Sequence, residues 1–236
     1  GLSGVRQVGR VRRGHSLPRI QGVPDPEAIV TTMYTKPIED ITFSDVEEFV
    51  RQKKRENLIL EYKENWPRRD IARVIAAMAN TQGGLILIGV TEEDKTGLPG
   101  NIVGVDTCGG EDVLRRRASQ SAYQGIYPPV MPEVQVVSLD RDPDRAVVIV
   151  RVLPSDHTPH AVDNRRKIYV RLDSHNQPHE TLASLTELEW LWDRRRKAEE
   201  ARDALIEDAI ERANWILESG AGPQDWDRIR LLWPTL

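Results

Sequence analysis

One stretch of sequence constrains the fold more than any other: the apolar run Leu85–Val90, which contains no polar side chain. A continuous run of this kind is typical of a β-strand that is covered on both faces. A second stretch with strand composition, 58–63, precedes it and is stopped by Trp66-Pro67. Between the two stretches, apolar residues follow the i, i+3, i+4, i+7 spacing of an amphipathic helix, at Ile71, Val74, Ile75 and Met78. The sequence therefore predicts a strand, a helix and a strand over residues 58–90.

The segments that follow extend this unit. A short strand is predicted at 102–105, and a helix follows at 111–123. Two strands at 134–139 and 146–153 form a predicted hairpin, and a last strand lies at 167–171. Asp140–Asp144 contains the turn of the hairpin. We therefore expect an α/β (α+β) fold in which a mixed β-sheet carries packed helices.

Two capping boxes mark helix beginnings. The first is Ser44-Asp45-Val46-Glu47, before a short helix that ends in basic residues; the second, Ser184-Leu185-Thr186-Glu187, opens a helical stretch that ends only at Gly220. Five of the six tryptophans lie in this C-terminal part, at Trp190, Trp192, Trp215, Trp226 and Trp233. The long helix either forms an interface with another chain or a further domain, or folds back over its own sheet.

The chain divides into three parts. Residues 1–40 form an extended arm, residues 41–183 form the α/β domain, and residues 184–236 form a C-terminal helical extension. Before Asp25, all charged side chains of the arm are arginines. This arm is either a solvated terminus or a basic strap that follows phosphates or holds a neighbouring subunit.

Composition excludes several classes of protein. The net charge of −4 gives no overall basic field, so a nucleic-acid site has to be local. A single cysteine, Cys108, excludes an internal disulfide framework and a cysteine-based zinc cluster. No run approaches the ~20 apolar residues of a membrane helix, and the N-terminus lacks the apolar stretch of a signal peptide. We expect a cytoplasmic protein without a membrane partner.

Three blocks of sequence resemble the signature of Schlafen-type AlbA-like domains. They are Glu56-Asn57-Leu58-Ile59-Leu60-Glu61-Tyr62-Lys63, then Ala76-Ala77-Met78-Ala79-Asn80-Thr81-Gln82-Gly83-Gly84, then Leu85-Ile86-Leu87-Ile88-Gly89-Val90. Later segments agree with the same family pattern, at Ile102–Val105, Thr158–His160 and Tyr169–Arg171 with Ser174 beyond. The order and spacing hold over roughly half of the chain, and the combination is more specific than either motif alone.

The resemblance implies nucleic-acid handling. Schlafen cores cleave structured RNA at a divalent-metal site of three carboxylates, which implies Glu56, Glu61 and a third acid just after the Gly-Val strand. Here Thr91 stands at that third position and Glu92 follows it, so Glu92 is the candidate ligand for Mg²⁺ or Mn²⁺. No Gly-x4-Gly-Lys-(Ser/Thr) phosphate loop is present, so no ATP cofactor is expected.

The residues themselves suggest a chemistry for this site. Glu61 and Lys63 are two apart on a strand, so they point to one face while Tyr62 points to the other. A carboxylate beside a lysine suits phosphodiester hydrolysis, because one holds a metal and the other steadies a water or the developing charge. Glu56 has to precede the strand to join them. The alternative for these residues is a solvent-facing salt bridge at a sheet edge.

Basic residues gather in several places that phosphates could follow. The candidates for nucleic-acid contact are Arg68, Arg69, Arg73, Arg115, Arg116, Arg165, Arg166, Lys167 and Arg171. The histidines His157, His160, His175 and His179 are interpreted mainly as loop residues. Asn80, Gly83 and Gly84 are interpreted as turn formers and not as ligands.

Three functions remain open. The chain is a metal-dependent nuclease for RNA or single-stranded nucleic acid centred on Glu56, Glu61, Lys63 and Glu92, a non-catalytic DNA-binding transcriptional regulator, or an assembly module with a relic site. Schlafen cores place two related lobes in one chain, whereas this chain has one copy of the motifs. We therefore expect a homodimer or larger assembly, built through the C-terminal helix and the N-terminal arm.

Overall fold

The computed structural model describes residues 33–67, 70–93, 96–107, 109–174 and 177–219. Several sequence predictions fall outside these residues: those on the N-terminal arm before residue 33 and those on Arg68, Arg69, Cys108, His175, Trp226 and Trp233.

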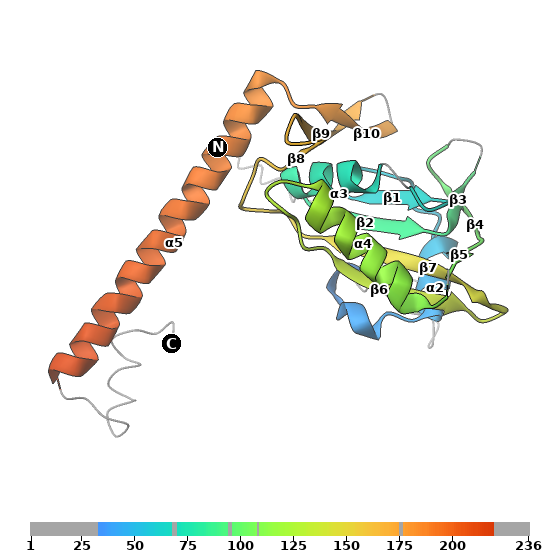
Figure 1. The fold of residues 1–236 in the computed structure, drawn as a ribbon, viewed down its shortest axis with the longest axis horizontal. Coiled ribbons are helices and arrows are strands. Elements are labelled where there is room, and N and C mark those ends of the chain that lie inside the picture. Colours follow the sequence, from blue (N-terminus) through green and yellow to red (C-terminus); the bar gives the residue numbers. More distant parts are fainter. Residues whose placement is uncertain (1–32, 68–69, 94–95, 108, 175–176, 220–236) are drawn as a thin grey trace, which may run out of the picture.

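A five-stranded mixed sheet forms the centre of the molecule (Figure 1). Its strands are β1 (Leu60–Lys63), β2 (Gly84–Ile88), β5 (Val105–Asp106), β6 (Glu133–Leu139) and β7 (Asp142–Val152). Strand β1 pairs with β2 in parallel, and β2 pairs antiparallel with β7, which also pairs with β5 and β6. The predicted mixed sheet and the β6–β7 hairpin are confirmed.

Helices cover both faces of this sheet. On one face lie α3 (Ile71–Asn80) and α4 (Glu111–Gly125), and on the other lie the 3-10 turn η1 (Ile38–Asp40) and α2 (Phe43–Arg51) (Figure 1). Along β2, Ile86 and Ile88 pack in the core under α3 and α4, whereas Leu85 and Leu87 pack in the core under α2. Coverage of both faces explains why the sequence of β2 is apolar without alternation.

The apolar run does not continue as one strand. Gly89 has a φ of 104°, and a Cβ at this position would lie 2.7 Å from the Cα of Gly104. The chain therefore turns at a residue that only glycine fits, and β3 (Val90–Glu92) pairs instead with β4 (Pro99–Ile102). The predicted single strand at 102–105 is likewise two strands, because β4 ends at Ile102 and β5 begins at Val105.

One of the two predicted capping boxes is shifted. Helix α2 begins after Thr42, whose hydroxyl accepts a hydrogen bond from the backbone N–H of Asp45 while the Asp45 carboxylate accepts one from that of Thr42. The box is therefore Thr42 with Asp45, two residues earlier than Ser44 with Glu47. The second box is confirmed, because Ser184 N donates to Glu187 Oε2 over 2.6 Å.

A second, three-stranded sheet packs beside α3. It contains β8 (Ala161–Val162), β9 (Lys167–Ser174) and β10 (Gln177–Leu182). Asn80, at the end of α3, fastens this sheet: its amide donates to His160 O (2.9 Å) and Tyr169 O (2.8 Å) and accepts from His160 N (2.8 Å). Asn80 is fully buried and therefore fixes two segments 80 and 89 residues away, a role beyond that of a turn former.

The long helix α5 (Leu185–Ser219) begins against the domain and then projects away from it (Figure 1). Near its start Leu191 is buried, its carbonyl accepts from Thr158 Oγ1 (2.8 Å), and Arg194 Nη1 donates to Thr81 O (2.9 Å). Farther along, apolar side chains are exposed, among them Leu205, Ile206, Ile210 and Leu217. The helix thus packs on its own domain only near its beginning. No helix in the described part of the chain has the length and apolar character needed to cross a membrane.

Candidate functional site

Strand β1 brings two of the predicted site residues together. Glu61 and Lys63 lie on the same face, where Lys63 Nζ donates a hydrogen bond to the Glu61 carboxylate. Tyr62 points to the opposite face and packs in the core under α2. The alternation expected from the sequence is therefore confirmed.

The Glu61 carboxylate is buried and held by two cations. Besides Lys63, Arg171 on β9 donates from Nη2 to Glu61 Oε2 over 2.8 Å and from Nη1 to Glu180 Oε1 on β10 over 2.9 Å. The Arg171 side chain is 0% exposed and that of Glu61 is 7% exposed. The solvent-facing salt bridge considered for Glu61 is thus ruled out, and Arg171 lies inside the protein and not on a surface that a nucleic acid reaches.

Glu56 joins this cluster from the turn before β1. Its carboxylate accepts a hydrogen bond from the backbone N–H of Tyr62 (2.6 Å), and its own N–H donates to Gly97 O (2.7 Å). Burial, followed by the negative charge of Glu61, raises the pKa of Glu56 from 4.5 to about 7. Although burial lowers the pKa of Lys63, the charge and hydrogen bond of Glu61 outweigh burial, and the Lys63 pKa is raised. The predicted approach of Glu56 to Glu61 is confirmed.

The β3–β4 hairpin carries the residues at the third acidic position. Thr91 Oγ1 accepts a hydrogen bond from Asn101 N (2.8 Å), so this hydroxyl links the two strands of the hairpin. Glu92 is exposed, and its carboxylate accepts from Gly97 N (2.7 Å). Its charge nevertheless contributes to the raised pKa of Glu56. Glu92 therefore lies near Glu56, at the exposed margin of the cluster.

The cluster does not have the arrangement of a metal centre. Within the described ranges, no group of three or more His, Cys, Asp or Glu side chains is placed to hold a metal ion. Both oxygens of Glu61 already accept from cations of the chain, and one oxygen of Glu92 accepts from a backbone N–H. In this conformation the donor set does not fit a divalent cation, because Glu61 would first have to leave Arg171 or Lys63.

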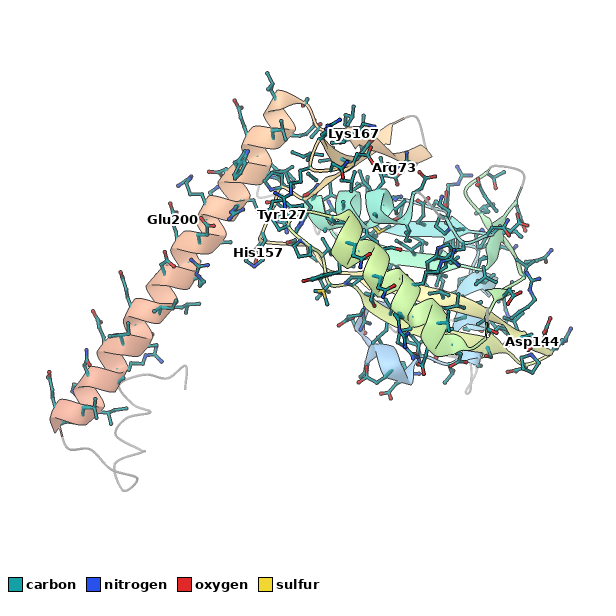
Figure 2. The ribbon with its side chains drawn as sticks, in the orientation of Figure 1. Arg73, Tyr127, Asp144, His157, Lys167 and Glu200 are labelled. Carbon is teal, nitrogen blue, oxygen red and sulfur yellow. The ribbon has the colours of Figure 1, made fainter. Side chains whose placement is uncertain are left out.

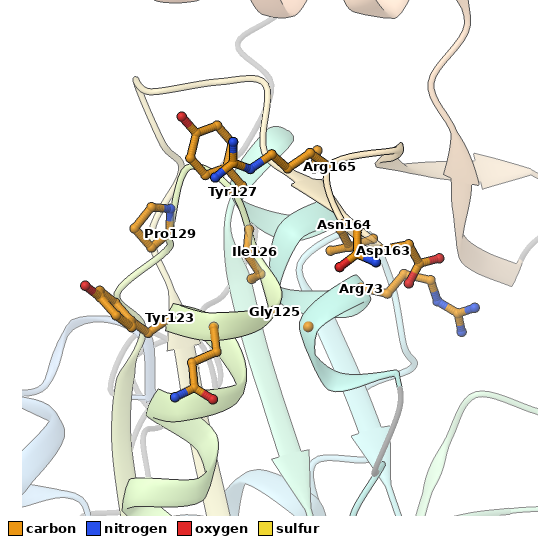
Figure 3. A pocket seen from close by; sticks show the side chains of 13 residues that line it. Arg73, Tyr123, Gly125, Ile126, Tyr127, Pro129, Asp163, Asn164 and Arg165 are labelled. Carbon is orange, nitrogen blue, oxygen red and sulfur yellow. The ribbon is translucent and has the colours of Figure 1, made fainter.

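A groove lies beside this cluster, between α3, the end of α4 and β8. It consists of two pockets of about 700 Å³ and about 370 Å³, which share the lining residues Ala72, Gln124 and Gly125. A Cβ at Gly125 would lie 2.9 Å from the Cβ of Ala72, so the glycine permits this close approach of α4 to α3. The larger pocket contains Arg73 on one side and Tyr123 and Pro129 on the other (Figure 3).

The arginines of the groove lie over aromatic rings. The Arg165 guanidinium is 3.6 Å from the centroid of the Tyr127 ring, and that of Arg117 is 4.7 Å from the Trp66 ring. Arg73 is 5.8 Å from the Tyr169 ring and has weak ion pairs with Asp70 (3.3 Å) and Glu180 (3.8 Å). Because Glu180 also binds Arg171, Arg73 connects the groove to the carboxylate cluster.

The other predicted basic residues are scattered. Arg73, Tyr127 and Lys167 lie at the end of the molecule where α5 begins, far from Asp144 at the tip of the β6–β7 hairpin (Figure 2). Lys167 is paired with Asp163 (2.9 Å), and Arg115 is paired with Asp112 (2.6 Å). Arg116 and Arg166 are exposed. Of the predicted contacts, the structure therefore brings Arg73 and Arg165 to one groove.

Sequence reasoning did not single out the aromatic side chains of the groove. Tyr123 lies in the last turns of α4 and Tyr127 lies beyond its end, so helical spacing does not predict that their rings share a rim. His160 lies in the irregular segment between β7 and β8, as its interpretation as a loop residue expects. It is nevertheless buried, and its Nδ1 lies 2.7 Å from Pro128 O.

Comparison with known proteins gives one family. The sequence profile of the family described as "Schlafen, AlbA_2" matches residues 56–180, which is more than half of the chain. The match begins at Glu56 and ends at Glu180, so it includes every residue of the carboxylate cluster and most of the groove. A search of curated proteins yields no match. The chain therefore belongs to the Schlafen, AlbA_2 family, and its central domain is a nucleic-acid-related domain.

Proposed function

We propose that this chain is a nucleic-acid-binding module that uses the groove between α3 and α4, and that its carboxylate cluster is a charge-balanced structural element. One observation carries the proposal: Arg117 and Arg165 lie over aromatic rings and have no acidic partner among the described residues. Phosphate binding needs cations whose charge is not already neutralised within the protein. In the cluster, by contrast, Lys63 and Arg171 face Glu61 and Glu180.

The groove also has the form that nucleic-acid recognition requires. Proteins that bind single strands combine a basic groove, which follows the backbone, with aromatic side chains on which bases stack. Both kinds of side chain occur here within one pair of adjoining pockets. The overall net charge of −4 does not oppose binding, because screening makes charges beyond about 10 Å unimportant at moderate salt.

The proposal is tested by measuring the affinity of the full chain for fluorescently labelled single-stranded RNA and DNA. The double variant Arg117→Gln with Arg165→Gln removes both unpaired cations of the groove. We expect its affinity to fall about 10-fold or more at low salt, because each phosphate contact contributes favourably. The matched control is Arg196→Gln on α5, an exposed arginine already paired with Asp193 and Glu200. Equal losses in the two variants, or no loss in either, would contradict the proposal.

A second candidate function is cleavage of RNA or single-stranded nucleic acid, with Mg²⁺ or Mn²⁺ as the expected cofactor. One observation favours it: Glu56, with a pKa raised to about 7, lies in the same cluster as Glu61 and Lys63. A carboxyl group that titrates near neutral pH is suited to proton transfer. Cleavage of tRNA and single-stranded DNA is measured with Mg²⁺, Mn²⁺ or a chelator, for the native chain and for Glu56→Gln. Products that vanish in the variant support cleavage, and intact substrate under all conditions excludes it.

We also propose that the chain forms a homodimer through α5. The support is the row of exposed apolar side chains Leu205, Ile206, Ile210 and Leu217 beyond the docked beginning of the helix. A helix with this much exposed apolar surface gains free energy by burying it against a partner. A symmetric pair is the commonest form of such an assembly, and it would supply the second lobe that a single chain lacks.

A further inference from the structure

The larger pocket of the groove presents two exposed aromatic rings. The Tyr123 side chain is 62% exposed and that of Tyr127 is 49% exposed, although Arg165 lies over the Tyr127 ring. Both tyrosines line the pocket that also contains Arg73 and Arg165 (Figure 3). Single exposed aromatic residues are common on protein surfaces, but two on the rim of one pocket with two arginines form a local surface for a flat, anionic ligand.

The turn that carries Arg165 has an unusual backbone. Asp163, Asn164 and Arg165, between β8 and β9, have φ angles of 51°, 58° and 69°. Asp and Asn tolerate this left-handed conformation, whereas Arg adopts it rarely and at a cost of about 1 kcal/mol or more. The conformation places the Arg165 guanidinium over the Tyr127 ring, 3.6 Å from its centroid. A strained residue that fixes a cation on the rim of a pocket is typical of a ligand site.

The size of the pocket limits the ligand. A volume of about 700 Å³ lies within the range of small-molecule sites, roughly 300 to 1,000 Å³. It therefore holds one or two nucleotides and not the width of a duplex. A base can stack on a tyrosine ring only if its own face is free, which is the case in single strands and not inside a double helix.

We propose that this pocket binds an unpaired nucleobase against Tyr127 and Tyr123, with the adjoining phosphates at Arg73 and Arg165. The inference rests on the proposed nucleic-acid-binding function and adds that the groove selects single-stranded over duplex nucleic acid. Stacking does not depend on base identity, because every base has a π face, so selectivity concerns strandedness and not sequence.

The test compares Tyr127→Leu with Tyr127→Phe in the full chain. Probes are labelled single-stranded RNA and DNA of about 12 nucleotides and the corresponding duplexes. Tyr127→Leu is expected to weaken single-strand binding by about 5- to 100-fold, because it removes the stacking surface, whereas Tyr127→Phe retains it and binds as the native chain does. Tyr123→Leu, at the more exposed ring, provides a second variant with little effect on folding. The matched control is Trp192→Leu, an exposed ring with Arg195 nearby, which lies on α5 outside the pocket.

A covalent readout complements the affinities. Single-stranded RNA that contains 4-thiouridine is irradiated in complex with the protein, and the linked peptide is identified by mass spectrometry. Attachment within 123–129 is expected. Single-strand binding that is equal in the leucine variants and in the native chain, duplex binding as tight as single-strand binding, or attachment elsewhere each overturns this inference while leaving nucleic-acid binding intact. Failure to bind any nucleic acid at low salt overturns both.

Discussion

At the scale of single residues, Arg171 determines whether the carboxylates of the cluster are free to bind a ligand. Its guanidinium binds Glu61, Glu180 and the backbone carbonyl of Asn57 (3.0 Å), and thereby joins the central sheet to the β9–β10 hairpin. Such a cation takes the place at Glu61 that a metal would need. Both oxygens of Glu61 are therefore held by cations of the protein, whereas the sequence suggested a carboxylate that binds a metal.

This arrangement predicts a large cost for removing Glu61. In Glu61→Ala, Arg171 stays buried with one carboxylate fewer, and we expect a loss of roughly 3–5 kcal/mol in the free energy of unfolding. Lys63→Ala serves as the control, because the Lys63 side chain is 34% exposed and its pairing contributes only about 0–1 kcal/mol after solvent screening. Urea denaturation of the two variants measures the difference. Equal, small losses in both would show that the buried pair does not stabilise the fold.

The raised pKa of Glu56 implies that the stability of the fold depends on pH. Its pKa is raised from 4.5 to about 7 by burial and by Glu61, so the folded state holds its proton more tightly than the unfolded state does. The resulting stabilisation is complete below 4.5, where both states are protonated, and is lost as the pH rises from 4.5 through about 7. Glu56→Gln keeps an acceptor for Tyr62 N–H but has no proton to lose.

The free energy of unfolding of Glu56→Gln, relative to the native chain, should therefore be higher at about pH 8 than at about pH 5, by roughly 1–3 kcal/mol. Urea denaturation at the two pH values measures it. The control is Glu64→Gln, at an exposed residue. Its free energy of unfolding relative to the native chain should be the same at both pH values. If the change in the free energy of unfolding caused by Glu56→Gln is independent of pH, Glu56 ionises as an ordinary surface carboxylate does.

At the scale of elements, α5 contains two regions with different surroundings. Its beginning is fixed to the domain by Leu191 and Arg194, whereas Leu205, Ile206, Ile210 and Leu217 are exposed. If these side chains meet a second copy, Ile206→Glu with Ile210→Glu will convert a dimer into a monomer without unfolding the domain. Light scattering on the full chain measures the change, with Glu200→Ala as an exposed control on the same helix. A native chain that is monomeric at tens of micromolar contradicts the dimer.

Periodicity and turn chemistry predicted the elements well where one face or both faces are buried. Helices α3, α4 and α5 and the β6–β7 hairpin follow directly from apolar spacing, the Ser184 cap and the turn residues. Prediction failed where tertiary contacts decide the boundary. Strand β2 ends before Gly89 because Gly104 approaches this glycine closely. Strand β8 is short and strand β10 is polar, so both depend on pairing with β9. Neither contact leaves a local signal in the sequence.

For the whole molecule, the sequence indicated the family, and it indicated that Glu56, Glu61 and Lys63 lie close together. It could not show that Arg171, 110 residues from Glu61, neutralises the cluster, because a surface arginine and a buried one look alike in sequence. It also could not show that Arg73, Arg165, Tyr123 and Tyr127 line one pocket, since they come from three separate segments of the chain. The proposed function therefore rests on this groove more than on the motif.

The salt dependence of single-strand binding tests this central claim most directly. The logarithm of the affinity of the full chain for single-stranded nucleic acid should fall linearly with the logarithm of the salt concentration, with a slope near −0.7 for each phosphate neutralised. For Arg117→Gln with Arg165→Gln, the slope should be smaller in magnitude by about 1.4, since two contacts are lost. The same slope in the native chain and in this variant would show that nucleic acid does not lie in the groove between α3 and α4.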